Sequence, residues 1–162
     1  MFRVGILTVS DKGASGERQD TAGPALQKLL NPQCFEVWDY KIVPDEYEKI
    51  AAALVSWSDQ EKLDLILTAG GTGPAPRDLT PEATLSVADK GVPGIPEAIR
   101  AAGLAKTPHA MLSRGVAVIR GKTLIINLPG SLKGATESLE AILPALPHAL
   151  EKLTGSPADC GT

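Results

Sequence analysis

Short apolar runs alternate along this chain with segments in which apolar residues recur every three or four positions. The runs are rich in β-branched residues, as buried strands are, and the recurring positions are typical of amphipathic helices. Strands are predicted at residues 2–9, 35–43, 63–68, 116–119 and 123–126. Helices are predicted at residues 21–30, from residue 45 or 46, from residue 81, at residues 95–103, and in a last stretch that ends near residue 153. Residues 10–19 are polar, contain two glycines, and are expected to form a loop.

The last helical stretch contains two prolines, Pro144 and Pro147. Proline removes a helical hydrogen bond and clashes with the preceding turn, so the helix should kink or divide there. The residues that follow are small and polar. We therefore expect one domain over residues 1–154 and a flexible tail over residues 155–162.

Alternating strands and helices predict an α/β fold with a mostly parallel sheet covered by helices on both faces. In such sheets, ligands bind outside the carboxyl ends of the strands. The unusual polar and glycine residues follow predicted strands, at Ser10 and Asp11, at Asp45, at residues 70–78 and at residues 129–133. We therefore expect these segments to form one composite site.

The composition is that of an ordinary globular domain, with 162 residues, 43% of them apolar and 22% charged. No apolar run approaches the roughly 20 residues of a membrane span, and the first residues read as a strand rather than a signal peptide. A cytoplasmic location without a membrane partner is expected. The net charge of −3 gives no electrostatic argument for nucleic-acid binding.

The chain contains few residues suited to a zinc site or a disulfide framework. Its two cysteines, Cys34 and Cys160, are far apart, and its two histidines, His109 and His148, stand alone. Incidental thiols, and surface or capping roles for the histidines, are the expectation.

Three glycines within four residues, Gly70, Gly71 and Gly73, form the most distinctive segment. Glycine lets backbone N–H groups turn toward a ligand, and a strand-to-helix turn of this kind often holds an anion. The spacing matches neither the phosphate loop of nucleotide hydrolases nor the dinucleotide fingerprint. A tight turn without a ligand is the competing interpretation. Arg77 and Asp78 add a fixed positive charge and a carboxylate to the same loop.

Five segments stand in a fixed order along the chain: residues 8–11 with 20–21, 44–46, 70–84, 111–114 and 127–131. In this order they resemble the MogA-type molybdopterin adenylyltransferase family, which also includes MoaB-like proteins and the G domains of gephyrin-like proteins. The resemblance extends from about residue 3 to residue 153.

This resemblance implies a three-layer α/β/α fold and a homotrimer. It also implies transfer of the adenylyl group of ATP to molybdopterin, with Mg²⁺ as the cofactor and pyrophosphate as the second product. The adenylylated molybdopterin would then pass to a molybdenum-insertion protein. The sequence leaves open whether molybdenum or tungsten is the eventual metal, and whether trimers pair into hexamers.

Residue roles follow from the same resemblance. Asp45 and Asp78 are the acidic pair expected to be catalytic and to ligate Mg²⁺. The remaining candidates are expected to bind the substrates through backbone N–H groups, hydroxyls or charge. They are Ser10 and Asp11 for a pterin edge, Gly70, Gly71, Thr72, Gly73 and Arg77 for the nucleotide or its phosphates, Ser113 and Arg114 for pterin or phosphate, and Pro129, Gly130 and Ser131 for the opposite wall.

Structural roles compete with several of these assignments. Asp45 and Ser131 are also placed to cap helices, Asp78 could brace its loop by an Asx turn, and Thr80 reads as a helix cap rather than a ligand. Two other functions stay open. One is a MoaB-like protein that binds molybdopterin without efficient transfer. The other is an unrelated nucleotide-handling enzyme with a similar glycine turn, against which the last two motifs argue.

Overall fold

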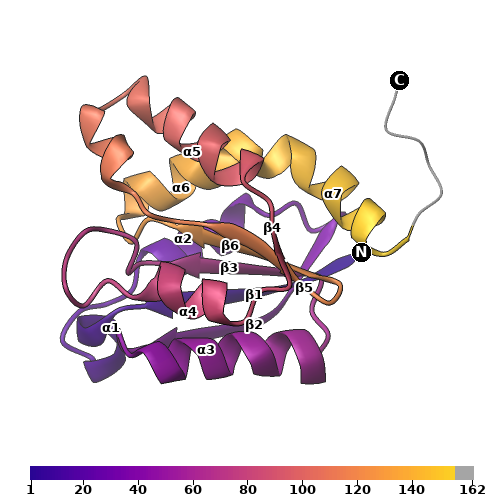
Figure 1. Ribbon diagram of the computed structural model, residues 1–162, viewed down its shortest axis with the longest axis horizontal. Coiled ribbons are helices and arrows are strands. Elements are labelled where there is room, and N and C mark those ends of the chain that lie inside the picture. Colours follow the sequence, from indigo (N-terminus) through magenta and orange to yellow (C-terminus); the bar gives the residue numbers. More distant parts are fainter. Residues whose placement is uncertain (156–162) are drawn as a thin grey trace.

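A six-stranded sheet runs through the middle of the computed structural model, which describes residues 1–155 (Figure 1). The strand order is β2-β1-β3-β6-β5-β4. The first four strands in this order are parallel, and β5 and β4 are antiparallel to their neighbours, so the predicted mostly parallel sheet is confirmed. The strands are β1 (Phe2–Val9), β2 (Phe35–Val43), β3 (Leu65–Ala69), β4 (Lys90–Gly91), β5 (Ala117–Arg120) and β6 (Thr123–Leu128).

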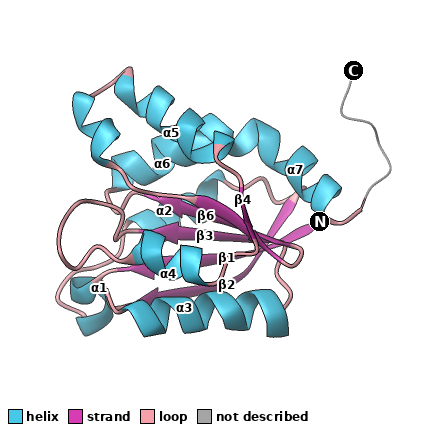
Figure 2. Cartoon of the chain, viewed as in Figure 1, coloured by secondary structure: helices cyan, strands magenta, loops and turns pink. Residues whose placement is uncertain are grey.

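Helices cover both faces of the sheet (Figure 2). Two of them, α3 and α4, lie on one face, and α2, α5, α6 and α7 lie on the other, which confirms the three-layer α/β/α fold. The helices are α1 (Asp11–Ser15), α2 (Ala22–Leu29), α3 (Tyr47–Val55), α4 (Thr80–Ser86), α5 (Gly94–Leu104), α6 (Leu132–Ile142) and α7 (Leu146–Leu153). Shorter turns are the π-helical η1 (Ser56–Gln60) and the 3₁₀ turns η2 (Pro108–Leu112) and η3 (Leu143–Ala145).

The central strands are buried on both faces, which explains why they read as continuous apolar runs in the sequence. In β1, Val4 and Ile6 pack under α2 and α6, whereas Leu7 and Val9 pack under α3 and α4. All five residues of β3 are buried. The sheet is therefore a rigid platform whose carboxyl edge carries the loops.

Two helical features show where the sequence prediction succeeded and failed. The last helix divides at η3, which contains Pro144, as predicted. The expected loop at residues 10–19 was wrong in part, because residues 11–15 form α1. The Ser10 hydroxyl caps this helix by accepting from the Gly13 N–H at 3.0 Å. Five residues are too few to show a helical period in the sequence.

The Asp20 carboxylate lies at the start of helix α2. Asp20 accepts hydrogen bonds from the N–H groups of Ala22 and Gly23, and from the hydroxyls of Thr8 and Tyr40. Burial and the hydrogen bond to Asp20 raise the pKa of Tyr40 to about 12. Asp20 therefore ties the start of α2 to the ends of β1 and β2.

The predicted tail, apart from Gly155, and Cys160 lie outside the described residues. Within residues 1–155, none of the helices is long and apolar enough to cross a membrane.

Candidate active site

The carboxyl edge of the sheet brings four sequence-distant loops together. The chain passes from β1 to β2 on one side and then to β3 on the other, so the strand order reverses at β1 and β3. Such a reversal opens a crevice above the strand ends. Asp11, Asp45 and residues 70–78 follow β1, β2 and β3, and residues 129–131 follow β6. The predicted gathering of these segments at one edge is thus what the fold produces.

The glycine turn after β3 has a backbone that only glycine fits. Gly70 has a φ of 111°, and a Cβ there would lie 2.2 Å from the Val9 carbonyl oxygen. Gly71 has a φ of 66°, and its Cβ would lie 2.2 Å from the Thr80 hydroxyl oxygen. Both the left-handed conformation and the close approach exclude larger residues.

Thr80 locks this turn rather than capping a helix, so the predicted cap was wrong. Its buried hydroxyl donates to the Gly70 carbonyl at 2.9 Å, whereas the residue at the cap of α4 is Leu79. The sequence pattern could not show this contact because the two residues are ten positions apart.

The backbone N–H groups of the glycine turn differ in their hydrogen bonding. The Gly70 N–H donates to the Leu128 carbonyl at 3.0 Å. The prediction that this N–H binds a ligand was therefore wrong. The N–H groups of Gly71, Thr72 and Gly73 have no acceptor within residues 1–155. Consecutive unpaired N–H groups of this kind suit an anion such as phosphate.

Asp45 and Asp11 hold each other in place across the crevice. The Asp11 N–H donates to Asp45 Oδ2 at 2.9 Å, and the Asp45 N–H donates to Asp11 Oδ1 at 3.0 Å. The competing role of Asp45 as a helix cap was wrong, because Glu46 stands at the cap of α3 and makes no side-chain cap bond. Burial raises the pKa of Asp45, and the negative charges of Asp11 and Asp78 add to this shift.

Arg77 pairs with Asp11 rather than pointing freely into the crevice. Its Nε and Nη2 donate to the two Asp11 carboxylate oxygens at 2.6 and 2.9 Å. This hydrogen bonding lowers the pKa of Asp11, which stays ionised. Arg77 also lies near Asp45, and Asp78 lies near Asp45 in turn, so the cluster keeps an excess of negative charge.

Asp78 braces its own loop and still exposes an oxygen. Its Oδ2 accepts the Ala75 N–H at 2.9 Å, so the competing bracing role is present. A Cβ at Gly73 would lie 2.8 Å from that oxygen, and a Cβ at Gly71 would lie 3.2 Å from Asp45 Oδ1, so both carboxylates lie against the glycine turn. The Oδ1 atoms of Asp45 and Asp78 accept no hydrogen bond from residues 1–155.

A cavity of about 300 Å³ adjoins the turn and lies between α5, η2 and α6. Five predicted site residues line it: Thr72, Gly73, Ser113, Pro129 and Ser131. The Ser131 hydroxyl also caps α6 by accepting the Gly134 N–H at 3.0 Å, the role that competed with substrate binding. Gly130 packs against Gly70, since its Cβ would lie 3.1 Å from the Gly70 Cα.

The far wall of this cavity was missed by sequence reasoning. It includes small, apolar and basic residues of α5, of η2 and of the link between them, among them Ile99, Gly103, Lys106, His109 and Leu112. The helix at 95–103 was predicted, but nothing in its pattern distinguishes a face that packs on the core from a face that lines a cavity. His109 is exposed on this wall, in η2.

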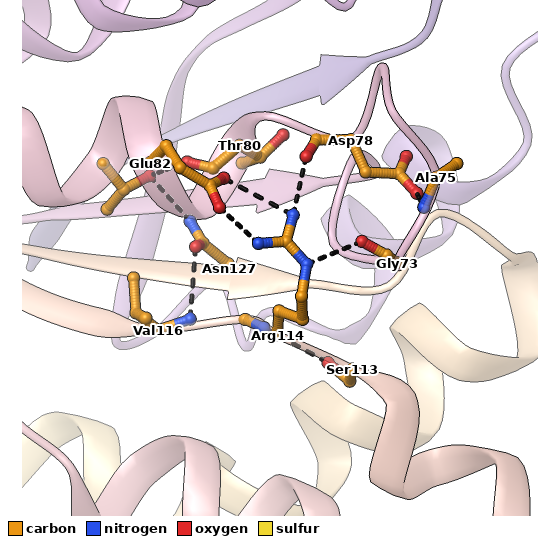
Figure 3. A network of polar contacts seen from close by, with 11 residues as sticks. Gly73, Ala75, Asp78, Thr80, Glu82, Ser113, Arg114, Val116 and Asn127 are labelled. Atoms are coloured by element: carbon orange, nitrogen blue, oxygen red, sulfur yellow. Dashed lines mark hydrogen bonds and ion pairs between the residues drawn. The ribbon is translucent and has the colours of Figure 1, made fainter.

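Arg114 lies below the loop and is surrounded by protein acceptors (Figure 3). Its Nε donates to the Gly73 carbonyl at 2.8 Å, its Nη2 donates to the Asp78 carbonyl at 2.6 Å, and its Nη1 pairs with Glu82. Buried Asn127 lies in the same network, with its Oδ1 accepting the Val116 N–H at 3.2 Å. The structure therefore gives the Arg114 side chain partners other than the expected substrate anion.

Comparison with known proteins identifies the family. A model described as a probable molybdopterin binding domain matches residues 5–148. The chain belongs to this molybdopterin-binding family. The molybdopterin adenylyltransferase of Helicobacter pylori strain J99 is 44% identical over 160 residues, which are 96% of this chain and 89% of that protein. The Escherichia coli K12 protein of the same name is 44% identical over 147 residues, 89% of this chain and 75% of that protein.

A solved structure of the same family shares both fold and sequence. The molybdopterin biosynthesis enzyme MoaB from Thermus thermophilus superimposes with a TM-score of 0.92 and is 62% identical. The match covers 98% of this chain and all of that one. The molybdopterin-binding fold thus extends over nearly the whole chain, as the resemblance implied.

Proposed function

We propose that this protein transfers the adenylyl group of ATP to molybdopterin, a late step in molybdenum cofactor biosynthesis. Relatives named molybdopterin adenylyltransferase are 38–44% identical over most of the chain. The observation that carries the proposal is the pairing of Asp45 and Asp78 beside the unpaired N–H groups of the glycine turn. Nucleotidyl transfer brings two anions together, which requires backbone donors and positive charge at one point.

In this reaction, a terminal phosphate oxygen of molybdopterin attacks the α-phosphorus of ATP. A new P–O bond forms, the bond to the oxygen that bridges the α- and β-phosphates breaks, and pyrophosphate leaves with that electron pair. The attacking phosphate is already ionised at neutral pH, so no general base is required. The N–H groups of Gly71, Thr72 and Gly73 bind phosphate oxygens, and the adjoining cavity takes a ring system of one substrate.

The residues present fit a Mg²⁺ ion. No group of three or more metal-binding side chains exists among residues 1–155, but magnesium is usually held by one or two carboxylates together with substrate phosphates and water. Asp45 and Asp78 each offer an Oδ1 that accepts no hydrogen bond from residues 1–155, and burial together with the charges of Asp11 and Asp78 raises the pKa of Asp45, which a bound cation would oppose. A bound Mg²⁺ would neutralise the charge that develops on the transferring phosphate.

A second function, molybdopterin binding without efficient transfer, is kept because the solved structure at 62% identity carries the name MoaB. The same fold and the same turn would serve this function. Only turnover distinguishes the two.

We also infer that the protein acts in the cytoplasm as a homotrimer and passes its product to a molybdenum-insertion protein. Large apolar side chains at the surface, Leu85, Met111 and Leu112, support association between copies, since each is more than half exposed. The molar mass in solution, measured by light scattering, tests the trimer.

The deciding experiment incubates the protein with molybdopterin, ATP and Mg²⁺ and measures pyrophosphate together with adenylylated molybdopterin. Pterin-dependent formation of both products is expected. Tight pterin binding without product would favour the binding protein, and neither binding nor product would overturn both functions.

A further inference from the structure

The loop that carries Asp78 has no regular secondary structure and little burial. Residues 74–77 are exposed, and they connect the glycine turn to α4. Exposed irregular loops sample many conformations unless something fixes them. A metal ligand at Asp78 therefore requires attachments that hold the loop at both ends.

Arg114 supplies those attachments from the segment before β5. Its side chain donates to the carbonyls of Gly73 and Asp78, which lie at the two ends of the exposed stretch. Its backbone N–H donates to the Thr72 carbonyl at 2.8 Å. One residue, 36 or more positions away in sequence, thus closes the base of the loop (Figure 3).

Glu82 fixes the direction of this guanidinium. It lies in the first turn of α4 and accepts from both Nη1 and Nη2 of Arg114. Hydrogen bonding to Arg114 lowers the pKa of Glu82, so the pair stays ionised. Each of the three guanidinium nitrogens of Arg114 has a protein partner, and Glu82 offsets its positive charge. Arg114 therefore has little to offer a substrate phosphate.

We propose that Arg114 is a positioning residue. It holds the loop at residues 73–78, and through it the Asp78 carboxylate, and Glu82 holds Arg114. The catalytic part of this proposal rests on the proposed function, whereas the structural part does not. Only the planar fork of arginine can reach two carbonyls and a carboxylate together, so lysine should not replace it.

The chain offers a matched control at the other end of the same strand. Arg120 closes β5, pairs with Asp59 and donates to the Val87 carbonyl at 2.9 Å. Its side chain is 26% exposed, compared with 37% for Arg114. Arg120→Ala therefore removes a similar guanidinium clamp without touching the loop.

The first test is amide hydrogen exchange by NMR, which needs no substrate. In Arg114→Ala, the amides of Ala75 and Asp78 should exchange at least about tenfold faster, since the loop loses charge-assisted hydrogen bonds. Arg120→Ala and the core amides of β1 and β3 should show no such change. Unchanged exchange at Ala75 and Asp78 in Arg114→Ala would overturn the proposal. If that variant fails to fold, Arg114→Lys is expected to show the same faster exchange at Ala75 and Asp78. Exchange in Arg114→Lys at the wild-type rate would equally overturn the proposal that Arg114 holds the loop.

The second test separates positioning from direct anion binding. For a clamp, Arg114→Ala lowers kcat for adenylyl transfer by about 100-fold through misplacement, with KM for molybdopterin within about threefold. Glu82→Gln, which frees the Arg114 charge, should also lower kcat. If Arg114 binds substrate phosphate instead, Glu82→Gln should tighten pterin binding and Arg114→Ala should weaken it. Should the wild-type protein show no transfer at all, the proposed function fails while the exchange experiment still decides the clamp.

Discussion

One arginine precedes β5 and another ends it, and the two secure different kinds of structure. At the carboxyl edge of the sheet, Arg114 joins an irregular loop to the first turn of α4. At the amino-terminal edge, Arg120 joins η1 to the end of α4 through Asp59 and the Val87 carbonyl. The second clamp ties together elements that already have their own hydrogen bonds. The first clamp orders a segment that has few, and that segment carries the candidate metal ligand.

The comparison extends to the acidic partners at the two edges. Asp59 is fully engaged by Arg120, because both of its carboxylate oxygens accept a guanidinium donor. Asp45 and Asp78 each keep one oxygen without a hydrogen bond from residues 1–155. Asp59 at the amino-terminal edge thus serves the fold, whereas Asp45 and Asp78 at the carboxyl edge each keep an oxygen for the proposed metal.

The largest difference between the two edges should appear in turnover when one carboxylate at each edge is replaced by an amide. Asp78→Asn keeps the size of the side chain but removes the charge expected at the metal, so adenylyl transfer should fall by at least about 100-fold. Asp59→Asn should leave turnover within about twofold of wild type. Pyrophosphate release measures both. Equal rates for wild type and Asp78→Asn would remove Asp78 from the site.

Buried polar side chains at the two ends of β6 provide the next contrast. The Asn127 amide donates to Thr68 and Thr84 at 3.0 Å and accepts the Val116 N–H, so its loss unpairs several buried groups. Thr123 makes one buried hydrogen bond, to the Leu63 carbonyl at 2.6 Å. Asn127→Ala should lower the free energy of unfolding by about 2–3 kcal/mol and Thr123→Val by about 1 kcal/mol. Urea denaturation measures both, and a smaller loss for Asn127→Ala would contradict the network.

Asp45 should show opposite effects on stability and on metal binding. Its folded-state pKa is raised by burial, so it stabilises the metal-free fold most when protonated, and this contribution is lost as the pH rises through that pKa. At neutral pH, the free energy of unfolding of Asp45→Asn should therefore equal that of wild type or exceed it by up to about 1 kcal/mol. In the same variant, Mg²⁺ should no longer support adenylyl transfer. Denaturation in chelator, followed by activity across Mg²⁺ concentrations, provides the measurement.

The raised pKa of Asp45 also predicts a pH dependence of Mg²⁺ binding. Because Asp45 in the metal-free protein keeps its proton to a higher pH than an ordinary aspartic acid, Mg²⁺ must displace that proton, and the Mg²⁺ concentration that gives half-maximal turnover should rise on acidification above the usual range of that side chain. An Mg²⁺ requirement that stays constant down to pH 3.8, the ordinary pKa of an aspartic acid, would contradict a role for ionised Asp45.

The smallest effect is expected at the tip of the loop. Arg77 and Asp11 form an exposed pair, with side-chain exposures of 63% and 42%. Exposed ion pairs contribute little to stability, and salt screens them. Arg77→Ala should leave the unfolding midpoint unchanged and reduce turnover by less than about fivefold. A loss as large as that of Arg114→Ala would place the main attachment of the loop at its tip instead of its base.

Much of the fold was predictable because local signals agreed with the tertiary structure. Buried parallel strands appear as apolar runs, the turn at residues 121–122 separates β5 from β6, and Pro144 marks the division of the last helix. The common edge of Asp11, Asp45 and the glycine turn followed from a general rule of parallel sheets rather than from any one residue.

Apart from α1, which is too short to show a helical period, the failures share a physical cause: partners far apart in sequence leave no local pattern. The Arg114 contacts with Gly73 and Asp78 span 41 and 36 positions, so the side chain looked like a free anion ligand. Thr80 looked like a cap because threonine at a helix start is typical of caps. Its hydrogen bond to Gly70 depends on the geometry of the turn, which the sequence does not show. The cavity wall on α5 and η2 needed the packing of helices on the sheet, which spacing does not reveal.

The most direct measurement is a crystal structure of the protein grown with adenylylated molybdopterin and Mg²⁺. We expect the adenylyl phosphate to contact the N–H groups of residues 71–73 and the metal to bind Asp45 and Asp78, with Arg114 still on its loop carbonyls. A product bound away from the glycine turn, or a metal held without either aspartate, would contradict the placement of the active site at the carboxyl edge.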